Sequence, residues 1–184
     1  MNSGSTSVAE AQGDMRAGYY GGAPGMLASA LVWLVAGGIA VTGTPAQAIL
    51  ALFVGGMGIH PVGVVLARAL GRPGAHTRGN PLGALALEST GLLLLGFPLA
   101  YVVAQAHQTW FFPAMLLVIG GRYLTFATLY GMRVYWACGA QLAVAGFLLV
   151  AMQAPFHWGA FAGAAIEGAY ALCIFRLIRG ASRS

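Results

Sequence analysis

Residues 24–43 read PGMLASALVWLVAGGIAVTG, a run that contains no charged side chain. At about 1.5 Å per residue, a helix of roughly 20 residues spans the hydrocarbon core of a bilayer, which is about 30 Å thick. A proline suits the first turn of such a helix, because its missing backbone N–H would have no partner there in any case. The run therefore predicts a transmembrane helix.

Five further apolar runs follow, separated by short links with turn residues or charges. The breaker Gly71-Arg72-Pro73-Gly74 ends the second run, and Asn80 offers an N-cap for the third. An aromatic belt, Trp110-Phe111-Phe112, opens the fourth run. The predicted spans cover residues 24–43, 46–70, 81–106, 110–131, 134–153 and a last stretch that ends near Ile178.

The composition indicates a chain solvated by lipid. Of its 184 residues, 59% are hydrophobic, 7% are charged and none is lysine, which is too apolar for a surface that faces water throughout. The net charge of +5 does not indicate nucleic-acid binding, because the arginines are scattered between apolar runs. Cys138 and Cys173 lie inside apolar runs without metal-type spacing, so neither a metal site nor a disulfide framework is predicted.

The arginines predict the orientation of the spans. With six spans, every arginine except Arg122 falls on one side of the membrane, and positive segments are retained in the cytoplasm. Both termini are therefore expected to be cytoplasmic. The chain divides into an N-terminal tail at 1–22, a six-helix transmembrane domain at 23–178 and a basic tail at 179–184, and Val8 to Tyr20 are expected to form an interfacial helix. The arginines on the predicted inner side are Arg16, Arg68, Arg72, Arg78, Arg133, Arg176, Arg179 and Arg183.

Polar groups inside the predicted spans are the candidates for function. An ionisable group there costs roughly 2.5–3.5 kcal/mol to insert unless it finds a partner, water or a route to the interface. Counting residues from the inner ends of the spans places these side chains at a similar depth, which predicts one polar layer. The candidate binding or proton-linked residues of this layer are His60, Glu88, Arg122, Gln141 and Glu167.

Glu167 and Arg122 are the most informative members of the layer. Gly159 and Gly163 precede Glu167 at intervals of four residues, so the carboxyl lies on a face of small residues that predicts close contact with another helix. Arg122 does not readily lose its charge, and Glu88 and Glu167 are the acids at its depth. We therefore expect an ion pair between Arg122 and one or both acids. Such a pair would serve either a binding site or helix packing alone.

His60 and Pro61 lie in the middle of the second span. The proline removes one backbone hydrogen bond and clashes with the preceding turn, which predicts a kink beside the imidazole. Carbonyl groups freed by the kink would be able to bind a cation or relay protons together with His60. A neutral histidine that a neighbouring helix satisfies is the alternative.

Several segments resemble a known family. They are YYGGAPG at 19–25, NPLG at 80–83 with LEST at 87–90, and a run from WFFPAM at 110–115 through GGRYLT at 120–125 to YGMR at 130–133. On these segments, the chain resembles a family of small bacterial multi-pass membrane proteins of unknown function, over most of residues 15–175. The resemblance implies a bacterial inner membrane and supplies no catalytic or cofactor-binding residues.

The sequence leaves three classes of function open. The leading hypothesis is a transporter-like bundle that moves or binds a small solute or ion at the polar layer. The alternative is a structural or accessory membrane protein whose polar layer only fixes helix packing. An intramembrane enzyme is third, because no nucleophile elbow, phosphate loop, dinucleotide fingerprint or zinc-protease pair is present. The lipid bilayer is the predicted partner, a homo-oligomer stays open, and no nucleic acid or cofactor is expected.

Overall fold

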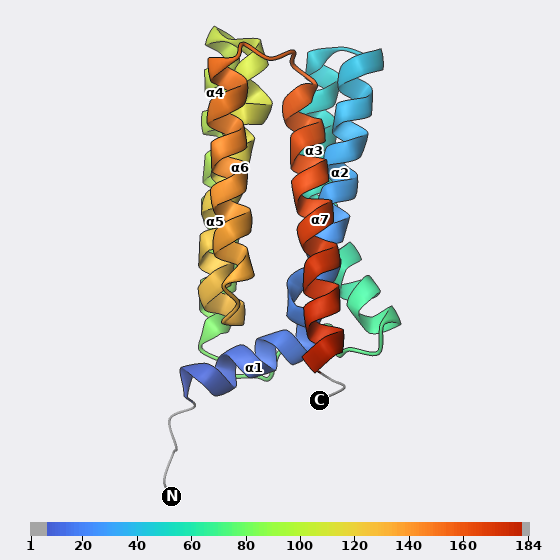
Figure 1. Ribbon diagram of the computed structural model, residues 1–184, viewed down its shortest axis with the longest axis vertical. Helices are drawn as coiled ribbons and strands as arrows, with labels where there is room; N and C mark the ends of the chain where they lie inside the picture. The colour runs from blue at the N-terminus through green and yellow to red at the C-terminus, as the bar shows by residue number, and fades with distance from the viewer. Residues whose placement is uncertain (1–6, 182–184) are drawn as a thin grey trace, which may run out of the picture.

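The computed structural model describes residues 7–181, and this part of the chain is helical without strands (Figure 1). Residues 1–6 and Arg183 lie outside the described range. Six helices are long and apolar enough to cross a membrane, so the predicted fold of a multi-pass membrane protein is confirmed. The spanning helices are α2 (Ala23–Thr42), α3 (Pro45–Ala69), α4 (Leu82–Ala106), α5 (Phe111–Tyr130), α6 (Val134–Ala151) and α7 (Trp158–Ala181).

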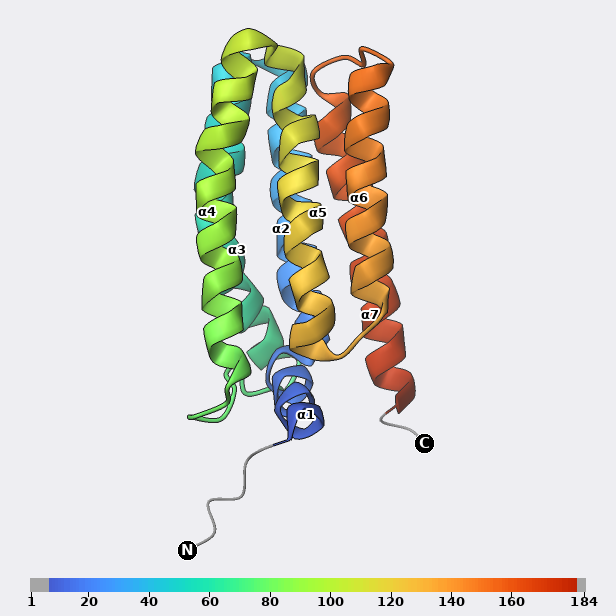
Figure 2. The same cartoon turned by 90° about the vertical axis from the view of Figure 1, so that its left-hand side faces the viewer.

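The spanning helices run up and down in two layers of three. One layer consists of α3, α2 and α7, the other of α4, α5 and α6, and α2 and α5 are the middle helices (Figure 2). Successive helices follow one another around this ring, and α7 closes it against α2. The ring is loosest between α3 and α4, where the backbones make few close approaches. The rings of Phe53 and Phe97 bridge these two helices, with centroids 4.7 Å apart.

Capping side chains and a left-handed glycine mark the ends of several helices. Thr44 and Gln47 form a capping box at the start of α3: the Thr44 hydroxyl accepts the Gln47 N–H at 3.3 Å, and the Gln47 amide oxygen accepts the Thr44 N–H at 2.9 Å. The side-chain oxygen of Asn80 accepts the Leu82 N–H at 2.9 Å, which caps α4. Gly131 ends α5 in the left-handed conformation, with φ at 62°.

Helix α3 is bent, as the sequence predicts for a helix with an internal proline. Its last turns depart from the line of its first part, at the lower right of Figure 1, and Pro61 lies in the second half of the helix. A proline inside a helix removes one hydrogen bond and crowds the carbonyl four residues earlier, which accounts for the bend. His60 is exposed at this bend, and its ring centroid lies 6.5 Å from that of Tyr19.

A further helix, α1 (Val8–Tyr19), lies across one end of the bundle (Figure 1). It occupies the segment for which the sequence predicts an interfacial helix. Tyr20, Gly21 and Gly22 all have positive φ and form η1, an elbow that turns the chain from α1 into α2. We call this the arginine-rich end, because it holds Arg16, Arg68, Arg72, Arg78, Arg133, Arg176 and Arg179.

Aromatic side chains fill the core between the layers. The Trp33 ring on α2 faces Phe112 on α5, with centroids 6.0 Å apart, and both side chains are completely buried. Nearer the arginine-rich end, Tyr135 is stacked between Tyr123 and Tyr130, at centroid distances of 5.8 and 5.5 Å. Lipid is as apolar as these side chains, so their close packing, rather than exclusion of water, holds the layers together.

Candidate functional site

Glu167, near the middle of α7, is the one acidic or basic side chain classed as buried among the described residues, and its exposed fraction is 0%. The small-residue face that precedes it is buried too, as predicted. A methyl group at Gly163 would lie 2.7 Å from the Trp33 indole, and one at Gly159 would lie 2.6 Å from Phe112. Glycine at these two positions therefore lets α7 approach both α2 and α5, which places the carboxyl inside the bundle.

Donor groups surround the Glu167 carboxyl without completing a hydrogen bond to it. The hydroxyls of Ser29 and Tyr123 and the indole N–H of Trp33 face the carboxyl. Neither carboxyl oxygen reaches hydrogen-bonding geometry with them, and Trp33 Nε1 is also buried without a partner. An ionised carboxylate without bonded donors or a counter-ion in contact is far costlier to bury than a neutral carboxyl. The closed packing therefore suits the protonated form.

Arg122 on α5 does not pair with an acid. Its guanidinium donates to the Thr90 hydroxyl at 3.3 Å and lies 5.0 Å from the centroid of the Phe126 ring, while Nε is buried without a partner. No oxygen of Glu167 or Glu88 lies within 4.0 Å of its nitrogens, so the expected ion pair is wrong. The two side chains point in different directions, because Arg122 reaches Thr90 on α4 whereas Glu167 lies beside Ser29 and Trp33 on α2.

The other three candidates do not join these two. His60, Glu88 and Gln141 are exposed on the outer surfaces of α3, α4 and α6. The sequence placed all five side chains at a similar depth, but these three do not face the interior of the bundle. Residue counting fixes the depth of a side chain, but the rotation of its helix decides whether it points inward. Arg122 and Glu167 lie within the bundle, and the proposed binding role of the candidates stays a prediction.

Sequence reasoning missed two members of the site, Ser29 and Trp33. They are four residues apart on α2, so they occupy one helix face. Tryptophan in membrane proteins is enriched at the interfaces, and Trp33 lies instead in the middle of its span. That displacement is the signal by which Trp33 could have been found.

The titratable groups near Glu167 come from two other helices. Arg122 and Tyr123 belong to α5, and Cys138 belongs to α6. Cys138 is buried and Cys173 is exposed, and both are free thiols. No group of three or more His, Cys, Asp or Glu side chains that could hold a metal ion occurs between residues 7 and 181.

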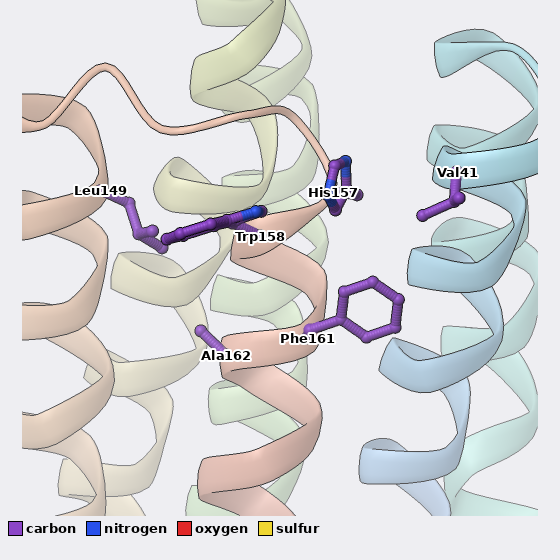
Figure 3. A pocket seen from close by; sticks show the side chains of 6 residues that line it. All are labelled: Val41, Leu149, His157, Trp158, Phe161 and Ala162. Atoms are coloured by element: carbon purple, nitrogen blue, oxygen red, sulfur yellow. The ribbon is translucent and has the colours of Figure 1, made fainter.

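A recess of about 390 Å³ opens at the end of the bundle opposite the arginines (Figure 3). His157, just before α7, and Phe161 on α7 project toward Val41 on α2, while Trp158 lies toward Leu149 on α6. Ala162, also at the recess, precedes Glu167 by about 8 Å along the helix axis at 1.5 Å per residue. The recess therefore ends short of the buried carboxyl.

At the arginine-rich end, α1 is fastened to α5. The Gln12 amide donates to the Thr128 carbonyl at 2.7 Å, and the Arg16 guanidinium donates to the Tyr130 carbonyl. These carbonyls belong to the last turn of α5, where no helical N–H remains to satisfy them. A helix that lies across the bundle thus caps one of its spanning helices.

The same helix is fastened to the link between α3 and α4. Asp14 accepts the Thr77 N–H at 2.9 Å, the Thr77 hydroxyl at 2.8 Å and the Asn80 amide at 2.7 Å. These hydrogen bonds, above all that from Asn80, hold the pKa of Asp14 below its usual value. Gly18 adds a backbone contact by accepting the Gly74 N–H at 2.9 Å. Helix α1 therefore connects α5 to the link between α3 and α4, the two neighbouring helices whose backbones approach each other least.

Comparison with known proteins adds a family but no activity. No curated protein and no solved structure shows a significant match to the chain. The family profile of DUF7010, described as a family of unknown function, matches residues 8–177. The match covers helices α1 to α6 and most of α7. The chain therefore belongs to DUF7010, a family of unknown function.

Proposed function

We propose that the protein moves a small solute or ion across the membrane in a step linked to protonation of Glu167. The observation that carries this proposal is a completely buried carboxyl between two helix layers, with both oxygens unpartnered and an unpartnered indole N–H beside it. Buried polar groups in proteins are nearly always hydrogen-bonded, and ionisable groups at membrane depth mark substrate, ion or proton pathways. An unsatisfied acid here favours a role beyond packing.

Protonation would act through the balance between a closed and an open arrangement of the layers. The neutral carboxyl is compatible with the closed packing of Gly163 against Trp33. Loss of the proton would leave a charge that needs water or a cation, and this would favour separation of the layers. Ser29, Tyr123 and the Trp33 indole, which face the carboxyl, would then stabilise it as donors.

Proteoliposomes loaded with a pH-sensitive dye test the proposal. The purified protein is exposed to a panel of small cations, anions and neutral solutes, and each is scored for a proton flux. A solute that elicits a flux with the unmodified chain and none with Glu167→Gln supports the proposal. Glu88→Gln is the matched control, because that acid is exposed on α4 and should not affect the flux.

A second measurement addresses the proton itself. Infrared difference spectra between about pH 5 and pH 9 should contain a carboxyl signal that disappears in Glu167→Gln, since the substitution removes the group that exchanges a proton. Identical difference spectra for both proteins would contradict a proton-linked step, whichever solutes the liposome panel contains.

A structural or accessory membrane protein is the second candidate. The observation that favours it is the closed interior, in which Gly163 lies directly against Trp33 and Glu167 has no exposed surface. Under this alternative, no solute elicits a flux. The Glu167→Leu variant is also expected to be as stable as the unmodified chain or more so, because an apolar side chain of similar size needs no partner.

A further inference from the structure

Two arginines that are far apart in the sequence converge on Tyr20. Arg72, in the link between α3 and α4, lies over the phenol ring, with its guanidinium carbon 5.0 Å from the centroid. Arg179, near the end of α7, donates from Nε to the Tyr20 hydroxyl at 3.3 Å. Phe175 packs against the same ring at a centroid distance of 5.3 Å. Three separate segments therefore place two guanidinium groups around one phenol.

The backbone of Tyr20 is strained at this position. Its φ of 53° and ψ of 43° lie in the left-handed region, which a bulky residue seldom adopts. Gly21 and Gly22, which follow it, adopt positive φ without that steric conflict. The elbow thus holds a tyrosine where the backbone favours glycine, and the phenol meets Arg72 and Arg179.

Neither arginine has an acidic partner among residues 7–181. Glu10 is engaged by Ser7, and Asp14 is engaged by Thr77 and Asn80. The two remaining acids of the chain, Glu88 and Glu167, lie within α4 and α7, away from this end. The guanidinium groups at Tyr20 therefore carry positive charge that nothing in the described chain neutralises.

We propose that Tyr20, Arg72 and Arg179 bind the phosphodiester of an anionic membrane lipid. Guanidinium groups present several N–H donors in a planar fork that matches phosphate oxygens, and the Tyr20 hydroxyl, which accepts from Arg179, keeps its own proton to donate. The site lies at one end of the spanning helices, where lipid headgroups are found, and basic pockets between helices at this level bind anionic headgroups.

The neighbouring face of α7 offers a place for an acyl chain. A shallow groove of about 590 Å³ runs along this face of α7 and extends to Gly180, the residue that follows Arg179. Apolar side chains line most of it, and Arg176 is its one charged residue. The groove is lined by Ala169, Leu172, Cys173, Arg176, Leu177 and Gly180. A free phosphate ion would use the guanidinium groups alone, whereas a lipid would use the groove as well.

Thermal unfolding in a neutral detergent tests the site, because a ligand that binds the folded chain raises its unfolding temperature. Titration with short-chain phosphatidylglycerol should raise this temperature, while phosphatidylcholine and inorganic phosphate at the same concentrations should not. An equal rise with inorganic phosphate would overturn the assignment to a lipid, and an equal rise with phosphatidylcholine would overturn the recognition of an anionic headgroup.

Variants locate the binding. Arg72→Gln and Arg179→Gln should each weaken the phosphatidylglycerol affinity about fivefold, which is the contribution of one arginine near an anionic headgroup. Arg78→Gln is the matched control, since Arg78 lies at the same end and is exposed. An equal loss with Arg78→Gln would show that only the overall charge matters, and this would overturn the site.

Two milder substitutions cover the case in which loss of a guanidinium group unfolds the elbow. Arg179→Lys keeps the charge but loses the donor fork, and Tyr20→Phe keeps the ring under Arg72 but loses the hydroxyl. Both should weaken lipid binding, and both should lower the unfolding temperature of the lipid-free protein less than Arg72→Gln or Arg179→Gln does. Unchanged affinity in both variants would also overturn the proposal.

Discussion

At the scale of single residues, the interior contains two ionisable side chains that do not contact each other. Glu167 faces α2 with unpartnered oxygens, and Arg122 faces α4, where it contacts Thr90 and Phe126. If the acid and the arginine formed an ion pair, the effect on stability of replacing one would depend on whether the other was present. The two separate groups should instead respond independently to substitution.

Replacing Arg122 by methionine should change the free energy of unfolding by less than about 1 kcal/mol, or raise it. No acid contacts Arg122, so its removal leaves no uncompensated charge, and the cost of burying the guanidinium disappears. Chemical unfolding in detergent, followed by circular dichroism, measures the change, and Arg122→Lys serves as the charge-preserving control. A loss of about 3–5 kcal/mol would instead indicate a buried ion pair.

Gly22→Ala should destabilise the protein by about 2 kcal/mol or more. The φ of Gly22 is 86°, and an added methyl group would lie 2.4 Å from the Tyr135 hydroxyl and 2.8 Å from the Tyr130 ring. Backbone strain and overpacking therefore act together. Gly38→Ala is the control, because Gly38 is helical and nothing lies near its position. In detergent, the unfolding temperature of Gly38→Ala should be well above that of Gly22→Ala.

At the scale of elements, α1 is the helix whose attachment depends most on hydrogen bonds. It reaches α5 through Gln12 and Arg16 and the α3–α4 link through Asp14. Helices such as α2 and α7 are held by packing along their length, whereas α1 rests on a few polar contacts at the surface of the bundle. Conditions that remove those contacts should therefore release α1 first.

The attachment of α1 should weaken in acid. The pKa of Asp14 is lowered in the folded chain by hydrogen bonds, chiefly from Asn80, relative to about 3.9 in an unfolded chain. A lowered pKa means that this contribution to stability is present above about pH 4 and is lost as the pH falls through the folded value. A nitroxide label at Ala17, which is exposed on α1, should become more mobile over that range.

Two variants separate Asp14 from its surroundings. Asp14→Asn should make the label at Ala17 mobile already at neutral pH, because an amide presents its own donors to the Asn80 amide and carries no charge. Glu10→Gln is the matched control, since Glu10 is hydrogen-bonded to Ser7 at the start of α1 and not to another helix or link among residues 7–181. Equal mobility in these two variants would show that Asp14 does not hold the helix.

The sequence was sufficient to predict the elements but not their rotation. Span lengths and turn signals such as Thr44-Pro45 and Gly131 are local, and they placed the helix ends within a few residues. The spanning helices, in contrast, are apolar on all sides, so their sequences have no polar face that indicates the inner side. Glu167 was predicted correctly because Gly159 and Gly163 mark its face, and both glycines contact neighbouring helices. Gly56 precedes His60 by the same interval of four residues but has open space beside it, so the same signal was misleading there.

At the scale of the whole molecule, the distribution of arginines is what distinguishes the two ends of the bundle. A bundle of six up-and-down helices fits a membrane equally well in either orientation, so the helices alone do not determine which end faces the cytoplasm. The described arginines break this equivalence, because all of them except Arg122 lie at one end. The proposed lipid site at Tyr20 lies at that end as well, where Arg72 and Arg179 meet.

Single-cysteine labelling tests this orientation in cells. Cys138 and Cys173 are first replaced by alanine, and one cysteine is then introduced at His107, Gln153, Arg78 or Arg133. Positively charged links stay in the cytoplasm, so a membrane-impermeant maleimide should label positions 107 and 153 in intact cells and positions 78 and 133 only in inverted vesicles. Because His107 and Arg78 lie at opposite ends of the single helix α4, labelling of both from one side would mean that α4 does not cross the membrane.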